Sequence, residues 1–456
     1  MSAEEPSCNC PWGGIRVDVG LDLDASGVLE SGEVRETMYL CHPDDGSAAA
    51  CDGGDTGSDT DGGTSTSDGG TSTSDGGTEP EPEPGPIAGT ITLVAGTLKS
   101  ACSVSPCGDG GPASDAKLYS PSGMMIDYED NVYTAEFSLH AVRMISAETG
   151  YIYTFAGQQR TSCTEAPCGD GGPATAALLN GPRGGGVDLD GNIYIADFSN
   201  HAIRKVDKAT GIITTVAGRI RESCSTTPCG EGGQATDARL NSPTGVQFDS
   251  YNNMFISDYG NHIIRRVDAE TGIITTIAGT MKSSCFSSPC GDGGQATDAQ
   301  FNGPSRLAID SNDNIFVTEY GNHVVRRIDA STGIITTYAG TQKASCSVYP
   351  CGDGGPATST DARLTSPFSL TVDAHDNVYI ADSSNAAIRF VDKNTGIIST
   401  VAGIVKSSCG VVPCGTGGPA TAAQLSNPFE VAFNSMGEMY ILEYSNQAIR
   451  KVTPTP

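Results

Sequence analysis

Twelve residues near the N-terminus have the spacing of a calcium-binding loop. Oxygen donors stand at loop positions one, three, five, nine and twelve, and a backbone carbonyl is available at position seven. Gly27 stands at position six, where an EF-hand loop turns sharply. Because calcium prefers hard oxygen ligands, we predict that it binds here; an acidic turn that only shares this spacing is the alternative. The predicted ligands are Asp22, Asp24, Ser26, Val28, Glu30 and Glu33.

The calcium loop lies in a small cysteine-bounded module, predicted to span residues 1–51. Residues 15–19 look extended, so we do not expect a paired helix–loop–helix, and the ion would have a structural role. Four cysteines in this module allow three pairings, of which the one between the first two is the least favourable sterically. They are Cys8, Cys10, Cys41 and Cys51.

Twelve further cysteines form six Cys-x4-Cys pairs. Zinc would need four ligands, and the loops that carry these pairs contain no histidine, so we predict six local disulfides and keep zinc as the alternative. Each disulfide should stiffen its own loop and join no two repeats. The predicted pairs are Cys102–Cys107, Cys163–Cys168, Cys224–Cys229, Cys285–Cys290, Cys346–Cys351 and Cys409–Cys414.

The cysteine content also bears on localisation. Paired cysteines at this density indicate an oxidising compartment, so we expect an extracellular or cell-surface protein. Residues 1–5 show neither the basic nor the apolar region of a signal peptide, which conflicts with that expectation. We give more weight to the cysteines; an intracellular protein with reduced thiols is the alternative.

Charged and imidazole side chains recur at fixed positions and could bind an ion. Each cysteine loop carries a base three residues after an Ala-Gly step, and five of the six loops carry an acid beside the second cysteine. We expect ion pairs or turn caps within each loop; a charged ring that binds an ion or polar ligand is the alternative. Four histidines (His140, His201, His262 and His323) share one turn position, too far from a common centre to hold a metal together. An acid and an arginine that recur in all six copies read as a scaffold ion pair.

All these positions recur because the chain contains six copies of one sequence unit. The Ala-Gly step ends at Gly96, Gly157, Gly218, Gly279, Gly340 and Gly403. Within residues 180–218, four short apolar segments alternate with tight-turn residues, which is typical of antiparallel strands. Four strands in each of six units predict an all-β fold, a six-bladed β-propeller of four-stranded antiparallel blades. A lone strand at residues 90–96 should complete the last blade and close the ring.

The propeller should span residues 88–456, after a linker at residues 52–87. The linker is rich in Asp, Gly, Ser and Thr and then alternates Glu with Pro. Because it has almost no apolar residues to bury, we predict that it is disordered, flexible at first and then stiffer.

The repeat motifs resemble NHL repeats. The motifs are Pro-x-Gly-Val-x-x-Asp at residues 243–249, Asn-Ile-Tyr-Ile-Ala-Asp at residues 192–197 and Asn-His-x-Ile-Arg at residues 261–265. The Gly-Asp-Gly-Gly-Pro-Ala-Thr element is similar to the bacterial and teneurin-type branch of that family. The resemblance implies that the Pro-x-Gly strand is innermost. The cysteine pairs depart from the family pattern, so functions carried by the loops of relatives transfer poorly to this chain.

The two faces of the predicted disc differ. In an antiparallel meander, alternate connections share a face, so all six cysteine loops lie on one face, which we call the looped face. The other, with short turns, is the plain face. Long loops on a rigid scaffold are the usual place for binding. At the entry to the inner strands, residues that differ between copies should face the channel mouth on the looped face and contact a ligand: Arg183, Arg306, Phe368, Phe429 and Glu430.

The function predicted from these features is a binding scaffold, with a protein or glycan partner on the looped face. A net charge of −28 argues against nucleic-acid binding, and no segment has the apolar length of a membrane span. We expect a monomer, and no cofactor in the propeller. Since six-bladed relatives include a zinc lyase, a metal-assisted lyase or lactonase is the alternative function. A purely structural spacer is the third.

Overall fold

The computed structural model of the protein describes residues 2–4, 14–20, 34–41, 89–224, 227–285, 288–347 and 349–454. They fall into two compact units, within residues 1–80 and within residues 81–456.

The first unit contains a three-stranded antiparallel sheet. Strand β1 (Ser2–Glu4) pairs with β2 (Gly14–Gly20), and β2 pairs with β3 (Val34–Cys41). Residues 15–19 therefore form a strand, in agreement with the extended conformation expected for them. The six predicted calcium ligands, Cys8, Cys10, Cys51 and the linker lie outside the described residues, so the calcium site and the disordered linker remain predictions.

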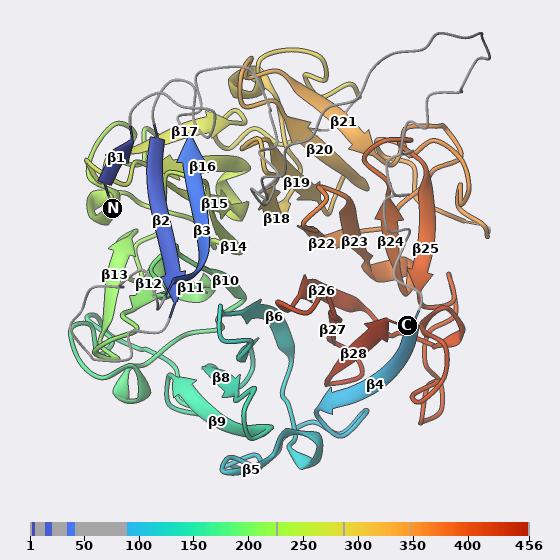
Figure 1. The fold of residues 1–456 in the computed structure, drawn as a ribbon, viewed down its shortest axis with the longest axis horizontal. Coiled ribbons are helices and arrows are strands. Elements are labelled where there is room, and N and C mark those ends of the chain that lie inside the picture. Colours follow the sequence, from blue (N-terminus) through green and yellow to red (C-terminus); the bar gives the residue numbers. More distant parts are fainter. Residues whose placement is uncertain are drawn as a thin grey trace, which may run out of the picture. The chain divides into compact units, whose positions relative to one another are not determined.

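The second unit is a ring of six antiparallel sheets around a central axis (Figure 1), which confirms the predicted six-bladed propeller. Blade 1 comprises β6 (Pro121–Ile126), β7 (Val132–Glu136), β8 (Ala141–Ile145) and β9 (Tyr151–Ala156), with β5 (Gly111–Pro112) beside β9. Blade 2 comprises β10 (Gly184–Val187), β11 (Ile193–Asp197), β12 (Ala202–Val206) and β13 (Ile213–Ala217). Blade 3 comprises β14 (Gly245–Phe248), β15 (Met254–Asp258), β16 (Ile263–Val267) and β17 (Ile274–Ala278).

The remaining blades repeat this order. Blade 4 comprises β18 (Pro304–Ile309), β19 (Ile315–Glu319), β20 (Val324–Ile328) and β21 (Ile335–Ala339). Blade 5 comprises β22 (Pro367–Val372), β23 (Val378–Asp382), β24 (Ala387–Val391) and β25 (Ile398–Ala402). Blade 6 comprises β26 (Pro428–Phe433), β27 (Met439–Glu443), β28 (Ala448–Pro454) and β4 (Gly89–Ala95). Short 3-10 helices lie in the connections: η2 (Ala113–Asp115), η3 (Ala174–Ala176), η4 (Phe198–Asn200), η5 (Ala235–Asp237), η6 (Tyr259–Asn261), η7 (Ala296–Asp298), η8 (Ser383–Asn385) and η9 (Ala420–Ala422).

Strand β4 closes the ring, as predicted, because it pairs antiparallel with β28 and supplies the outer strand of blade 6. This pairing covers the edge of β28, which would otherwise expose unpaired backbone groups. The first strand of each blade is innermost, and neighbouring inner strands contact one another around the whole ring, β26 meeting β6.

Apolar side chains from consecutive blades interlock between the sheets. Tyr133 and Ala135 of β7, for example, pack in one cluster with Leu179, Ile193 and Ile195, which follow in the next repeat. All five residues of the second strand are buried in every blade, since this strand lies between neighbours on both faces. Burial of this surface is the main stabilising contribution, and it gives the axis a rigid wall.

Candidate functional site at the propeller axis

The cysteine loops are closed by the six disulfides predicted from the sequence. Each disulfide joins two cysteines of one loop and no two repeats, as expected, but side chains link the loops of neighbouring repeats. In five of the six loops, the base that follows the Ala-Gly step reaches back one repeat and donates to the carbonyl of the first cysteine in the preceding loop. Lys282 Nζ lies 3.0 Å from Cys224 O, and Lys99 Nζ lies 2.6 Å from Cys409 O across the ring closure. The same bond links Arg160 to Cys102, Arg221 to Cys163 and Lys343 to Cys285.

The sequence suggested ion pairs between the acid and the base of the same loop. Instead, the acids of these loops pair with buried arginines. Asp109 lies 2.7 Å from Arg143 Nη2, and the same guanidinium faces Glu136 at 3.4 Å. Burial raises the pKa of Glu136 to about 7, and the charge of Arg143 opposes that rise. Equivalent pairs recur in the other blades and confirm the scaffold ion pair.

The four histidines join neighbouring blades. Nδ1 of His201 accepts the backbone N–H of Ser242 at 3.0 Å, and His140, His262 and His323 make the equivalent bond. Burial lowers the pKa of His201, and the charge of Arg221 lowers it further. The imidazole is therefore held neutral, which its role as an acceptor requires. Among the described residues, no group of three His, Cys, Asp or Glu side chains is placed to hold a metal ion.

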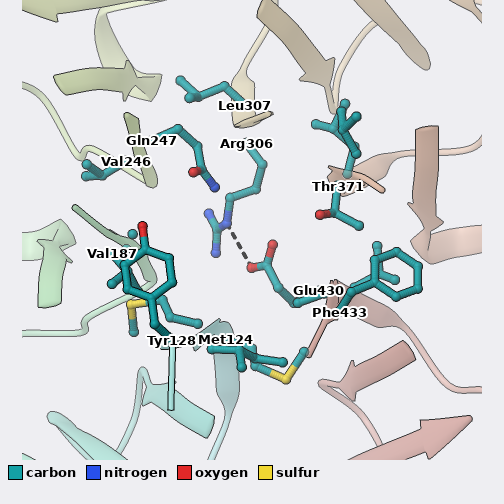
Figure 2. Close-up of a pocket in the computed structure, with 18 residues that line it drawn as sticks. Met124, Tyr128, Val187, Val246, Gln247, Arg306, Leu307, Thr371, Glu430 and Phe433 are labelled. Carbon is teal, nitrogen blue, oxygen red and sulfur yellow. Dashed lines mark hydrogen bonds and ion pairs between the residues drawn. The ribbon is translucent and has the colours of Figure 1, made fainter. Parts of the chain in front are cut away.

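The residues at the axis are those that differ between blades. Arg306, near the start of β18, extends across the channel to Glu430 of β26, and its Nε donates to Glu430 Oε2 at 2.9 Å (Figure 2). Both side chains are buried. Burial raises the pKa of the Glu430 carboxyl, and Arg306 is the strongest of the groups that counteract this rise.

The guanidinium of Arg306 contacts all six blades. Besides Glu430, it donates to the carbonyls of Ser122 at 2.8 Å, Arg183 at 2.7 Å and Ser305 at 3.3 Å, and to that of Thr244. Its carbon lies 5.0 Å from the ring centre of Phe368, which belongs to blade 5. A guanidinium has five N–H donors, and each has an acceptor here. The group therefore fastens the inner strands together and has no donor left for a ligand.

Small residues make room for this cation. At the repeat position equivalent to Arg306, blades 1, 2 and 3 have glycine. A Cβ at Gly184 would lie 2.7 Å from the guanidinium carbon, and one at Gly245 would lie 3.1 Å from Cδ of Arg306. The sequence thus combines one large cation with gaps at the facing positions.

Arg183 lies on the looped side of Arg306 and is unpaired. Its guanidinium carbon stands 5.1 Å from the ring centre of Phe137 and 4.4 Å from that of Phe198. In the described parts of the chain no side-chain nitrogen of Arg183 has a hydrogen-bond acceptor, and its Nε is buried. Burial lowers the pKa of Arg183, and the charge of Arg306 lowers it further.

Aromatic rings continue around this mouth. Phe368 stacks on Phe429 with ring centres 4.2 Å apart, and Phe429 stacks on Tyr444 at 4.6 Å. Tyr320 meets Phe368 edge-on at 6.2 Å. We call Arg183 and these rings the aromatic mouth: Phe137, Phe198, Tyr259, Tyr320, Phe368, Phe429 and Tyr444.

The structure thus gathers the five residues singled out from the sequence but divides them. Arg306 and Glu430 neutralise each other inside the channel, whereas Arg183, Phe368 and Phe429 form part of the aromatic mouth. Sequence reasoning missed the rings that follow the second strand. Their signal was present, because the residue after the recurrent acid is Phe or Tyr in five of the six copies.

A ring of six four-stranded blades with long loops on one face defines the class of protein, and comparisons with known proteins define the family. The model described as Teneurin NHL domain matches residues 156–228, 220–289 and 340–413, and the NHL repeat model matches residues 301–328. The chain belongs to the NHL-repeat β-propeller family. Residues 1–41 match a domain of unknown function, DUF7151.

Curated relatives with about 30% sequence identity include teneurins. Teneurin-3 of Danio rerio is 30% identical over 250 residues, and Teneurin-1 of Gallus gallus is 32% identical over 258 residues. These alignments cover 52% and 53% of this chain but only 9% of each relative. The chain therefore corresponds to a small part of the relatives that it matches.

Solved structures show the same fold. A Bacteroides thetaiotaomicron protein of unknown function is 19% identical with a TM-score of 0.55, over 79% of this chain and 74% of that chain. An auxiliary nutrient binding protein of Bacteroides ovatus is 16% identical with a TM-score of 0.54, over 81% and 78%. At these identities the likeness concerns the fold alone.

Proposed function

We propose that this protein is a secreted or cell-surface interaction scaffold, and that its propeller binds an acidic group of a protein or glycan partner at the aromatic mouth. The observation that carries the proposal is the unpaired guanidinium of Arg183. An arginine that is partly buried and has no acceptor is stabilised when a carboxylate or sulfate arrives. The surrounding rings offer flat apolar surface to the rest of the partner.

Rigidity of the looped face supports this proposal. Each cysteine loop is closed by its disulfide, and lysine or arginine side chains tie successive loops together around the ring. A surface that is ordered before binding loses less conformational entropy when the partner docks. Extracellular localisation rests on the same disulfides, since such bonds persist in oxidising compartments. Within the described residues, no helix is long and apolar enough to cross a membrane.

The N-terminal module has an accessory role in this proposal. The calcium ion held by residues 22–33 would stabilise the module, and the linker would keep it tethered to the propeller. The strands β2 and β3 on either side of the loop favour a structural ion over a helix-opening switch.

Binding of the full chain to a glycan array and to a panel of secreted proteins tests the proposal. The comparison is wild type against Arg183→Met, with Lys208→Met as a matched control because Lys208 follows strand β12 and lies on the plain face. We expect at least one partner whose binding falls by about tenfold or more in Arg183→Met and is unchanged in Lys208→Met. Absence of any partner, or partners that bind Arg183→Met as tightly as wild type, would overturn it.

A further inference from the structure

The channel continues on the other side of the Arg306–Glu430 pair as a cavity of about 270 Å³. The inner strands run from the looped face to the plain face, and the cavity is lined by residues that follow Arg306 and Glu430 along them, such as Leu307 and Phe433. Tyr128, in the turn after β6, stands at its rim (Figure 2). The cavity, called the channel pocket here, therefore opens on the plain face and is separated from the aromatic mouth by the ion pair.

The wall of the channel pocket combines aliphatic side chains with polar groups of the inner strands. Five of the six inner strands contribute an aliphatic side chain at the level directly below the ion pair, and the exception is Gly185 of blade 2. These side chains are Met124, Val246, Leu307, Leu370 and Val431. These side chains are themselves buried between the blades, so the surface that a ligand meets is formed largely by polar groups.

The floor of the pocket rejects a charged ligand. All five N–H groups of Arg306 already have acceptors, so it has no donor for an anion. Glu430 is neutralised by Arg306, so it offers little to a cation. A charged group placed against this floor would lose part of its hydration without gaining a partner, which is costly.

Two neutral polar groups face the pocket without partners. The side-chain amide of Gln247 in blade 3 and the hydroxyl of Thr371 in blade 5 reach toward the axis on either side of Arg306 (Figure 2). Neither side chain makes a hydrogen bond to any other described residue. The amide and the hydroxyl can each donate and accept a hydrogen bond. They are therefore placed to bind one neutral polar group between them.

We propose that the channel pocket binds a small neutral ligand that carries an amide, carbonyl or hydroxyl group. Gln247 and Thr371 would bind this polar group. This site is separate from the aromatic mouth and does not depend on the partner proposed there. Its volume limits the ligand to roughly ten to fifteen non-hydrogen atoms, since an engineered cavity of about 150 Å³ accepts benzene.

Methionine methyl NMR on the full chain tests the proposal, with benzamide as the probe and benzoate and benzylamine as charged compounds of matched size. Met124 lines the pocket, whereas Met436 is 71% exposed and Met439 is buried away from it. We expect benzamide to shift the Met124 methyl signal with a Kd of about 1 mM, as a ligand of this size allows. Met436 and Met439 should not move, and each charged compound should bind about tenfold more weakly or less.

Substitutions that keep the size and shape of the side chain give a second test of the proposal. Thr371→Val and Gln247→Met should each raise the Kd of benzamide about fivefold, the loss of one hydrogen bond. Arg183→Met should leave it unchanged, which separates this site from the aromatic mouth. An unchanged Met439 signal shows that each variant is folded. The proposal is overturned if benzamide leaves Met124 unmoved up to about 20 mM, if the charged compounds bind equally well, or if neither variant weakens binding.

Discussion

Replacement of Arg306 by methionine tests the role of the axial cation. The substitution leaves Glu430 buried without its counter-charge, so the folded state has to protonate it or keep an unpaired charge. Protonating a carboxyl of ordinary pKa at pH 7 costs about 3.5 kcal/mol, because each pH unit corresponds to about 1.4 kcal/mol. The charged hydrogen bonds to the carbonyls of Ser122, Arg183 and Thr244 are lost as well. We expect a loss of about 4 kcal/mol at pH 7.

The pH dependence of this loss identifies its cause. In the variant the pKa of folded Glu430 lies further above its unfolded value, so protonation stabilises the folded state at low pH, and this stability is lost as the pH rises. The part due to Glu430 should therefore shrink to about 1 kcal/mol near pH 5. Urea unfolding of the non-reduced wild type and variant at several pH values measures this pH-dependent loss of stability. The double variant Arg306→Met/Glu430→Gln should lack the pH dependence. Equal losses at pH 5 and pH 7, or no loss at all, would refute the reasoning.

Further predictions concern other parts of the chain. His201→Gln should remove stability that wild type has above pH 6.5 and loses as the pH falls, since the pKa of His201 is lowered by folding; urea unfolding at pH 7.5 and 5.5 measures the difference, and identical pH profiles would contradict it. Gly184→Ala should destabilise by about 1–3 kcal/mol through its contact with Arg306, whereas Gly410→Ala, with open space around it, should change the unfolding midpoint little. Lys282→Met should speed hydrogen exchange in the preceding cysteine loop, and unchanged exchange would argue against the loop-to-loop bond. Calorimetric titration of the full chain with calcium should show one site that Glu33→Gln abolishes; heat that persists in the variant would place the ion elsewhere.

The fold could be predicted because each repeat contains its own strand and turn signals, and because the 61-residue period brings equivalent residues into equivalent places. Contacts between repeats could not be predicted in the same way. Lys282 lies 58 residues from Cys224, close to one period, and the repeat pattern cannot show whether a side chain stays in its own loop or reaches the preceding one. The sequence therefore favoured ion pairs within a loop where the structure has bonds between loops.

The residues of the candidate site could be predicted from the sequence, but the contacts between them could not, because these contacts also join different repeats. Arg306 and Glu430 were noticeable because they interrupt the repeat, but their distance of 124 residues gave no sign that they pair. Glycine at the facing positions is the signal that could have suggested a cation across the channel. The unpaired state of Arg183 depends on the absence of nearby acceptors, which is a property of the assembled ring and not of any one repeat.

The account holds that the axis is closed by an ion pair and that the propeller binds partners, whereas the alternative lyase or lactonase would need a metal in the channel. Elemental analysis of the purified full chain carrying Asp24→Asn and Glu33→Gln, which removes the predicted calcium site, distinguishes the two most directly. We expect far less than one metal ion per chain, because Glu430 is already bound to Arg306. A metal at about one equivalent that is lost on Glu430→Gln would contradict the account.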